Sequence, residues 1–223
     1  GSGGGCRLIV DQGGVYNGGS VIVANGPDNG LGPDYLIVTN GGRALLIGTV
    51  ALANNVGGTV GKVVVTGSNS LLKVIGRNGL VRYATSGSSV TVSDGGTTTN
   101  GSWYIAWGAG GVTNGIVVTN GGRMFCSGSS LMCTNLCTNN FIVISGANSL
   151  WDNGAGDLTI AGGGTSTLNG VTINAGGMMT NVATLNLATP WATGSSNNYV
   201  TVDGGVLQAA ALTCSNDAPN TVT

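Results

Sequence analysis

The stretch IVTNGGR at Ile37–Arg43 returns as VVTNGGR at Val117–Arg123, and weaker copies fill the sequence between and beyond these two. We take the last apolar residue before each glycine-bearing turn as an anchor. The spacings between neighbouring anchors are 28, 27, 27, 26, 26, 29 and 29. A nearly fixed period in this range is typical of a protein built from stacked repeats. The anchors are Val10, Val38, Val65, Val92, Val118, Ile144, Ile173 and Val202.

Each repeat begins with a pattern that predicts a β-strand. An apolar residue lies two positions before every anchor, and side chains spaced by two share one face of a strand. The tetrapeptides that follow, such as TNGG at Thr39–Gly42 and SDGG at Ser93–Gly96, predict sharp corners, because Gly, Asn and Asp tolerate a left-handed backbone. The apolar residues before the anchors are Leu8, Leu36, Val63, Val90, Ile116, Ile142, Val171 and Val200.

Two more apolar runs follow each corner, for example Ala44–Ile47 and then VALA at Val50–Ala53. Glycine interrupts every window that could hold a helix. Strand, corner, strand, corner and strand within about 27 residues predict one coil of a parallel β-helix. We therefore expect an all-β fold with one β-solenoid domain of about eight coils over residues 1–223, in which 1–7 and 215–223 are terminal tails.

A longer repeat is superimposed on the single coil. TGSNSLL at Thr66–Leu72 matches SGANSLW at Ser145–Trp151. Each copy follows one of the two NGGR coils, and the two motifs recur at nearly the same offset. Three coils therefore form one super-repeat, which indicates duplication of a three-coil unit.

Composition excludes several classes of function. The chain has 43 glycines, 7% charged residues, a net charge of −1 and no histidine. Seven scattered cations provide no electrostatic footprint for nucleic acid. No apolar run approaches the length of a membrane span. Without histidine there is no Ser-His or Cys-His pair, and the aspartates form no evident catalytic cluster. We expect no enzyme activity, no cofactor and no metal.

Five cysteines suggest an oxidising compartment. Cys126, Cys133 and Cys137 lie within one coil, where a disulfide is favoured over zinc because a fourth ligand is lacking and the spacing is wide. The sequence does not choose the pair. Cys6 and Cys214 lie in the first and last coils and are candidates for contact between two molecules stacked end to end, with ordinary buried thiols as the alternative.

Aromatic residues mark one candidate recognition surface, SWYIAW at Ser102–Trp107. On a regular strand Trp103 and Trp107 share one face and Tyr104 lies on the other. If the tryptophan face points outward it can stack on a sugar ring or a neighbouring fibre; if it points inward it belongs to the core, which the pattern favours.

The alternation of V-x-V-T-N-G-G, T-G-x-N-S-L-W and L-T-I-A-G resembles the passenger β-solenoids of bacterial autotransporter adhesins and related repeat-bearing surface proteins. The run from Ile144 to Gly177 is typical of that family. The resemblance implies export, a cell-surface or extracellular location, and adhesive or structural use. The chain departs from the family in carrying five cysteines and no membrane barrel.

Two functional hypotheses follow. In the first, the chain is a structural subunit that stacks end to end into a fibre, because open strand edges at both ends of a β-helix favour pairing with another copy. In the second, it is a fragment of an adhesin passenger that binds surface glycans or matrix through the side of the solenoid.

Overall fold

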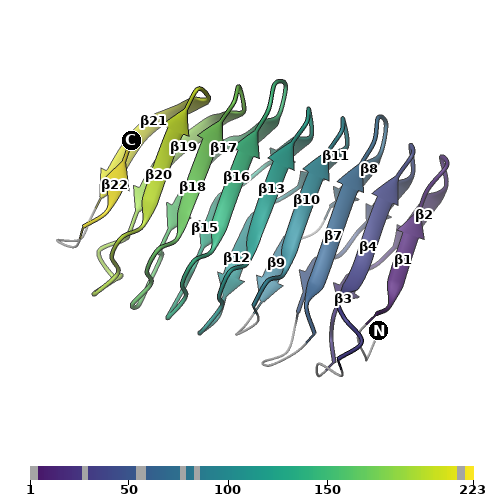
Figure 1. The fold of residues 1–223 in the computed structure, drawn as a ribbon, viewed down its shortest axis with the longest axis horizontal. Coiled ribbons are helices and arrows are strands. Elements are labelled where there is room, and N and C mark those ends of the chain that lie inside the picture. The colour runs from purple at the N-terminus through teal and green to yellow at the C-terminus, as the bar shows by residue number, and fades with distance from the viewer. Residues whose placement is uncertain (1–4, 27–29, 54–58, 76–78, 83–85, 215–218) are drawn as a thin grey trace.

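The chain is described by a computed structural model that covers residues 5–26, 30–53, 59–75, 79–82, 86–214 and 219–223. The described residues form strands and no helix. Strands from successive coils lie side by side along the long axis, from the purple N-terminal end to the yellow C-terminal end in Figure 1. All named strand pairs are parallel, and the fold is the β-solenoid that the sequence predicts.

The first face of the solenoid is a sheet of nine strands in the order β1-β4-β7-β10-β13-β16-β18-β20-β22. Its register repeats the sequence alignment residue by residue: Leu36 pairs with Val63, Val63 with Val90, and Val90 with Ile116. The predicted period is thereby confirmed, with seven full turns between the eight anchors. The strands are β1 (Arg7–Val10), β4 (Asp34–Thr39), β7 (Gly61–Thr66), β10 (Ser89–Ser93), β13 (Gly115–Thr119), β16 (Phe141–Ser145), β18 (Gly170–Asn174), β20 (Tyr199–Asp203) and β22 (Thr221–Val222).

The second and third faces are formed by separate strands in the first five coils and by single long strands afterwards. The second face holds β2 (Val15–Gly18), β5 (Arg43–Leu46), β8 (Leu71–Val74), β11 (Thr97–Asn100) and β14 (Arg123–Cys126). The third face holds β3 (Val21–Val23), β6 (Val50–Leu52), β9 (Gly79–Arg82), β12 (Trp103–Trp107) and β15 (Ser130–Met132). Three long strands run along both faces: β17 (Leu150–Ile160), β19 (Met178–Leu187) and β21 (Val206–Cys214).

The NGG sequence makes the first corner for two reasons. Asn120 and Gly121 both adopt the left-handed conformation, with φ of 49° and 76°. The next residue, Gly122, lies so close to the preceding coil that a Cβ atom there would stand 2.2 Å from the carbonyl oxygen of Val92. No larger residue fits that position without moving the backbone.

The paired NGGR and xNSL coils of the super-repeat are linked by hydrogen bonds. The N–H of Gly41 donates to Ser70 Oγ at 3.1 Å, and the N–H of Gly121 donates to Ser149 Oγ at 3.1 Å. Both serines are buried. The serine of each xNSL coil therefore satisfies the corner of the NGGR coil before it, which is the physical reason that the two sequences recur together.

One hydrophobic core runs the length of the solenoid, and its inward-facing residues are fully buried in the middle coils. Leu8, Tyr16 and Val21 of the first coil are only partly buried, as are three residues of the last coil, Val202, Leu207 and Ala209. Among the described residues, the apolar interior is therefore only partly covered at both ends.

The ends of the chain belong to the solenoid more fully than the sequence analysis predicted. Arg7, assigned there to a tail, begins β1, and Thr221–Val222 form β22 on β20. The prediction that 1–7 and 215–223 are tails is wrong at these residues, because Arg7 and Thr221–Val222 extend the parallel ladder. Residues 1–4 and 215–218 lie outside the described residues.

Candidate functional site

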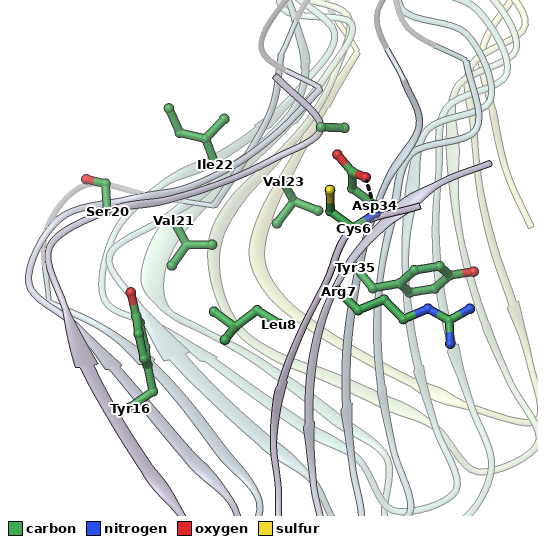
Figure 2. Close-up of a pocket in the computed structure, with 11 residues that line it drawn as sticks. Cys6, Arg7, Leu8, Tyr16, Ser20, Val21, Ile22, Val23, Asp34 and Tyr35 are labelled. Carbon is green, nitrogen blue, oxygen red and sulfur yellow. Dashed lines mark hydrogen bonds between the residues drawn. The ribbon is translucent and has the colours of Figure 1, made fainter. Parts of the chain in front are cut away.

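The N-terminal end of the solenoid is hollowed. A cavity of about 270 Å³ opens between the first strand of the first face and β3. Figure 2 shows side chains from both elements around it, and polar and apolar side chains both line the walls. Its lining includes Cys6, Leu8, Tyr16, Val21, Val23 and Asp34.

Asp34 supplies the polar group of this cavity. One carboxylate oxygen accepts a 2.8 Å hydrogen bond from the N–H of Cys6, as the dashed line in Figure 2 shows. The other oxygen, Oδ2, is buried and has no hydrogen-bond partner. A buried unpaired acceptor is costly, so the cavity favours an occupant that brings a donor. The sequence analysis missed Asp34, the first residue of β4, because an aspartate that follows Gly32 and Pro33 resembles an ordinary turn residue.

A column of asparagines inside the solenoid also escaped the sequence analysis. The N–H of Asn140 donates to Asn169 Oδ1 at 3.0 Å, and that of Asn169 donates to Asn198 Oδ1 at 3.1 Å. The side-chain amides form a second series of bonds along the same path, at 3.0–3.1 Å. The sequence signal is an asparagine directly before the first residue of a first-face strand. We call this column the asparagine ladder: Asn114, Asn140, Asn169, Asn198 and Asn220.

The structure brings two of the three central cysteines together and leaves the third apart. Cys133 and Cys137 are both buried, and their thiols interact directly. Cys133 Sγ also lies 3.1 Å from Asn169 Oδ1 and 3.2 Å from Asn140 Nδ2, on the asparagine ladder. Cys126 instead contacts Asn100 and Ser130. All five cysteines of the chain are described, and none is in a disulfide in this structure.

The thiol pair has unequal proton affinities. The hydrogen bond from Cys133 lowers the pKa of Cys137 to about 6, whereas burial raises the pKa of Cys133. Burial also raises the pKa of Cys126, to about 12. Cys137 is therefore the thiol that ionises first, and thiolates are the reactive form.

Cys6 and Cys214 are exposed at opposite ends of the solenoid, as their sequence positions predict. Cys214 is the last residue of β21, where Asn220 Nδ2 lies 3.7 Å from its sulfur. Cys6 lines the cavity at the other end. Within a single chain the two cannot meet.

The aromatic strand does not alternate regularly. Trp103 and Ile105 point into the core, but Ala106 adopts φ of 54° and shifts the register, so that Ala106 is buried and Trp107 turns outward. Trp107 is 42% exposed, and its ring centroid lies 4.5 Å from that of Tyr104 at 49°. The expectation that Trp103 and Trp107 share a face is wrong. Trp103 belongs to the core, and Tyr104 and Trp107 form the surface pair.

Within the described part of the chain, no group of three or more His, Cys, Asp or Glu side chains is placed to hold a metal ion. No described helix is long and apolar enough to cross a membrane.

Comparisons with known proteins add little. No family model matches the chain, and no curated protein matches it. Among solved structures it is similar to the crystal structure of a TibC-catalyzed hyper-glycosylated TibA55-350 fragment, with 20% identity over 99% of this chain and 89% of that one. The TM-score is 0.22, so the backbones of the two proteins do not superpose over most of their length.

Proposed function

We propose that this chain is a non-enzymatic structural protein of the cell surface or extracellular space, and that its solenoid stacks end to end on further copies of itself. We call the residues that pair in register from one coil to the next a column. The observation that carries the proposal is that columns of core residues begin at one end of the solenoid and end at the other with residues of similar, apolar character. In an in-register stack, the first coil of one copy would continue the columns that end in the last coil of another.

The column of Leu8 illustrates the match. It passes through one residue of every first-face strand, reaches Val200 in the eighth coil and ends at Val222 in β22, which is a ninth strand. The column of Tyr16 passes along the second face and ends at Leu207. Tyr16 and Leu207 are both partly buried residues of the core. Stacking would bury each against its counterpart and remove apolar area from water.

The backbone at both ends favours the same contact. Within the described residues β1, β2 and β3 are each paired on one edge, as are β21 and β22 at the other end. Unpaired strand edges are templates for pairing with another chain. An in-register joint would extend the second and third faces directly, and β1 of the next copy would take the place of β22, the ninth strand of the first face, beside β20.

Such a joint would also bring Cys6 of one copy near Cys214 of the next. The column of Cys214 ends at Val23 in the first coil. Val23 and Cys6 line the same cavity, as Figure 2 shows. In an oxidising compartment the two exposed thiols could therefore form a disulfide across the joint.

The test is negative-stain electron microscopy of the purified chain, with and without reductant. Filaments with an axial repeat of about 4 nm, from eight coils at the spacing of paired strands, are expected. Tyr16→Lys and Leu207→Lys should each abolish them, because each puts a charge into the joint. The control is Ile47→Lys, at an exposed position on the side of the solenoid. Isolated rods at high protein concentration would contradict the proposal.

The surface pair of Tyr104 and Trp107 favours a second candidate function, in which the side of the solenoid binds glycans as an adhesin does. Aromatic rings exposed side by side offer an apolar face to a sugar ring. Trp107→Ala should weaken retention of the protein in gels that contain polysaccharide. Trp191→Ala, which removes an 81% exposed tryptophan elsewhere, is the matched control. Equal retention of both variants would exclude this function for the pair.

A further inference from the structure

Two columns of small buried residues face each other where the third face ends and the chain turns back toward the first face. The first column holds residues in the left-handed conformation, with φ between 52° and 65°. Five of its six described members are alanines, and Cys133 is the exception. The members are Ala24, Ala53, Ala106, Cys133, Ala161 and Ala188.

The second column lies across the loop. Parallel bridges join Val112, Thr138, Thr167 and Ser196 in successive coils, which places the residues just before them in register. Those residues are Gly111, Cys137, Ser166 and Ser195. Cys137 therefore occupies a position that is glycine in the coil before it and buried serine in the two coils after it.

The two columns approach each other closely. In the coil before the cysteine pair, a Cβ atom built on Gly111 would lie 2.6 Å from the Cβ atom of Ala106. The two Cβ atoms of a disulfide are about 3.8 Å apart. The Cβ–Cβ distance between facing positions of the two columns is thus short enough for a disulfide, after a small movement of the loop that separates the two Cβ atoms further. Only at Cys133 and Cys137 do both described columns carry sulfur.

We propose that Cys133 and Cys137 form an intrachain disulfide when the protein meets an oxidising thiol–disulfide buffer, and that Cys126 stays a thiol. The geometry thereby selects one pair from the three cysteines of this coil. The hydrogen bond between the two thiols, which lowers the pKa of Cys137, agrees with this geometry. The inference does not depend on end-to-end stacking.

The chemistry balances with a small disulfide such as oxidised glutathione as the oxidant. The Cys137 thiolate attacks one sulfur of glutathione disulfide, which forms a mixed disulfide and releases one glutathione thiolate. Cys133, after losing its proton, attacks Cys137 Sγ and releases the second glutathione. The two cysteines lose two electrons and two protons, and glutathione disulfide becomes two glutathione molecules. Because both sulfurs are buried, the loop between them has to open for the first step.

The experiment uses the full chain with Cys6→Ser and Cys214→Ser, which removes the two exposed thiols. The protein is unfolded in urea with reductant, refolded in a buffer of reduced and oxidised glutathione, and treated with iodoacetamide. A protease that cleaves after leucine separates the two cysteines at Leu136. We expect the two peptides to remain joined until they are reduced, and Cys126 to carry the alkyl group.

Two variants sharpen the test. Cys133→Ala restores the residue of its own column and should stop at the mixed disulfide between Cys137 and glutathione. Cys137→Ser likewise restores the serine of its column and should leave Cys133 alkylated. Recovery of both cysteines in alkylated form from the refolded parent protein would overturn the proposal. So would a disulfide that contains Cys126.

Discussion

The backbone N–H of Gly121 donates a 3.1 Å hydrogen bond to Oγ of Ser149, which belongs to the next coil. Ser149 Oγ in turn donates to the carbonyl oxygen of Ser145 at 2.7 Å. One buried hydroxyl thus joins the corner of one coil to the corner of the next. The same arrangement of Gly41 and Ser70 occurs about three coils earlier.

Replacing that hydroxyl should cost stability. In Ser149→Ala the N–H of Gly121 loses its partner in a buried site, and such a loss costs about 1–3 kcal/mol. The urea midpoint, followed by circular dichroism, should therefore fall. Ser68→Ala is the control, because Ser68 is exposed on the equivalent corner of another coil. Equal midpoints for the two variants would mean that the bond contributes nothing to stability.

Gly122→Ala should be more damaging than the loss of one hydrogen bond. Its Cβ atom would be forced to 2.2 Å from Val92 O, so the two coils must separate or the corner must change. Overpacking of this kind typically costs about 1–3 kcal/mol and sometimes more. Gly19→Ala, with nothing within 4 Å of the new Cβ, measures the effect of alanine alone. A thermal midpoint as high as that of Gly19→Ala would refute the close approach.

Replacing Asn169, the central residue of the asparagine ladder, should lower the free energy of unfolding. Asn169 Oδ1 accepts hydrogen bonds from the backbone and side-chain amides of Asn140. Asn169→Ala leaves the backbone N–H of Asn140 unpaired in a buried site, whereas Asn140 Nδ2 keeps its bonds to the carbonyl oxygens of Gly111 and Thr138. We expect a loss of about 1–3 kcal/mol from the one unpaired donor. Hydrogen exchange should rise first at the amide of Asn140. The control is Asn139→Gly, since Asn139 is exposed and has φ of 56°, which glycine adopts freely.

The thiol pair predicts a pH dependence of stability. The pKa of Cys137 is lowered to about 6 in the folded chain by its hydrogen bond with Cys133, and an unfolded cysteine has a pKa of about 8.5. A lowered folded pKa adds stability above the unfolded value, and this stability is lost as the pH falls through the folded value.

Under reducing conditions the urea midpoint should therefore rise from pH 6 to pH 8, and it should rise less in Cys137→Ser. Cys126→Ser should keep the slope of the parent protein, because burial raises the pKa of Cys126 to about 12 and that thiol does not ionise in this range. A slope unchanged in Cys137→Ser would contradict the assignment.

The sequence predicted the fold because its signal is long and repeated. Each coil carries the same inward pair of apolar residues, and eight copies of this pair specify the register that the strands adopt. The position of a side chain relative to a local bend was not predictable in this way. Ala106, with φ of 54°, turns the side chain of Trp107 from the core to the surface. Nothing in the tetrapeptide YIAW distinguishes this alanine from one in a regular strand.

The columns were missed for a different reason. Asn140 and Asn169 are common turn residues in this sequence, and their hydrogen bonds join positions 29 apart in the chain. Sequence spacing identifies which residues are equivalent, but the buried or exposed state of an equivalent position depends on the shape of the coil. The pairing of Cys133 with Cys137 likewise follows from two columns whose approach only the structure reveals.

The asparagine ladder gives the solenoid a direction. From Asn140 to Asn169 to Asn198, each side-chain amide donates one hydrogen to the next asparagine toward the C-terminal end. Amide dipoles aligned along one axis add to one another. The ladder is thus a polarised row inside the C-terminal half of the solenoid, with its amide hydrogens directed toward the C-terminal end and its amide oxygens toward the N-terminal end. In the proposed stack, such rows would favour copies that all point the same way.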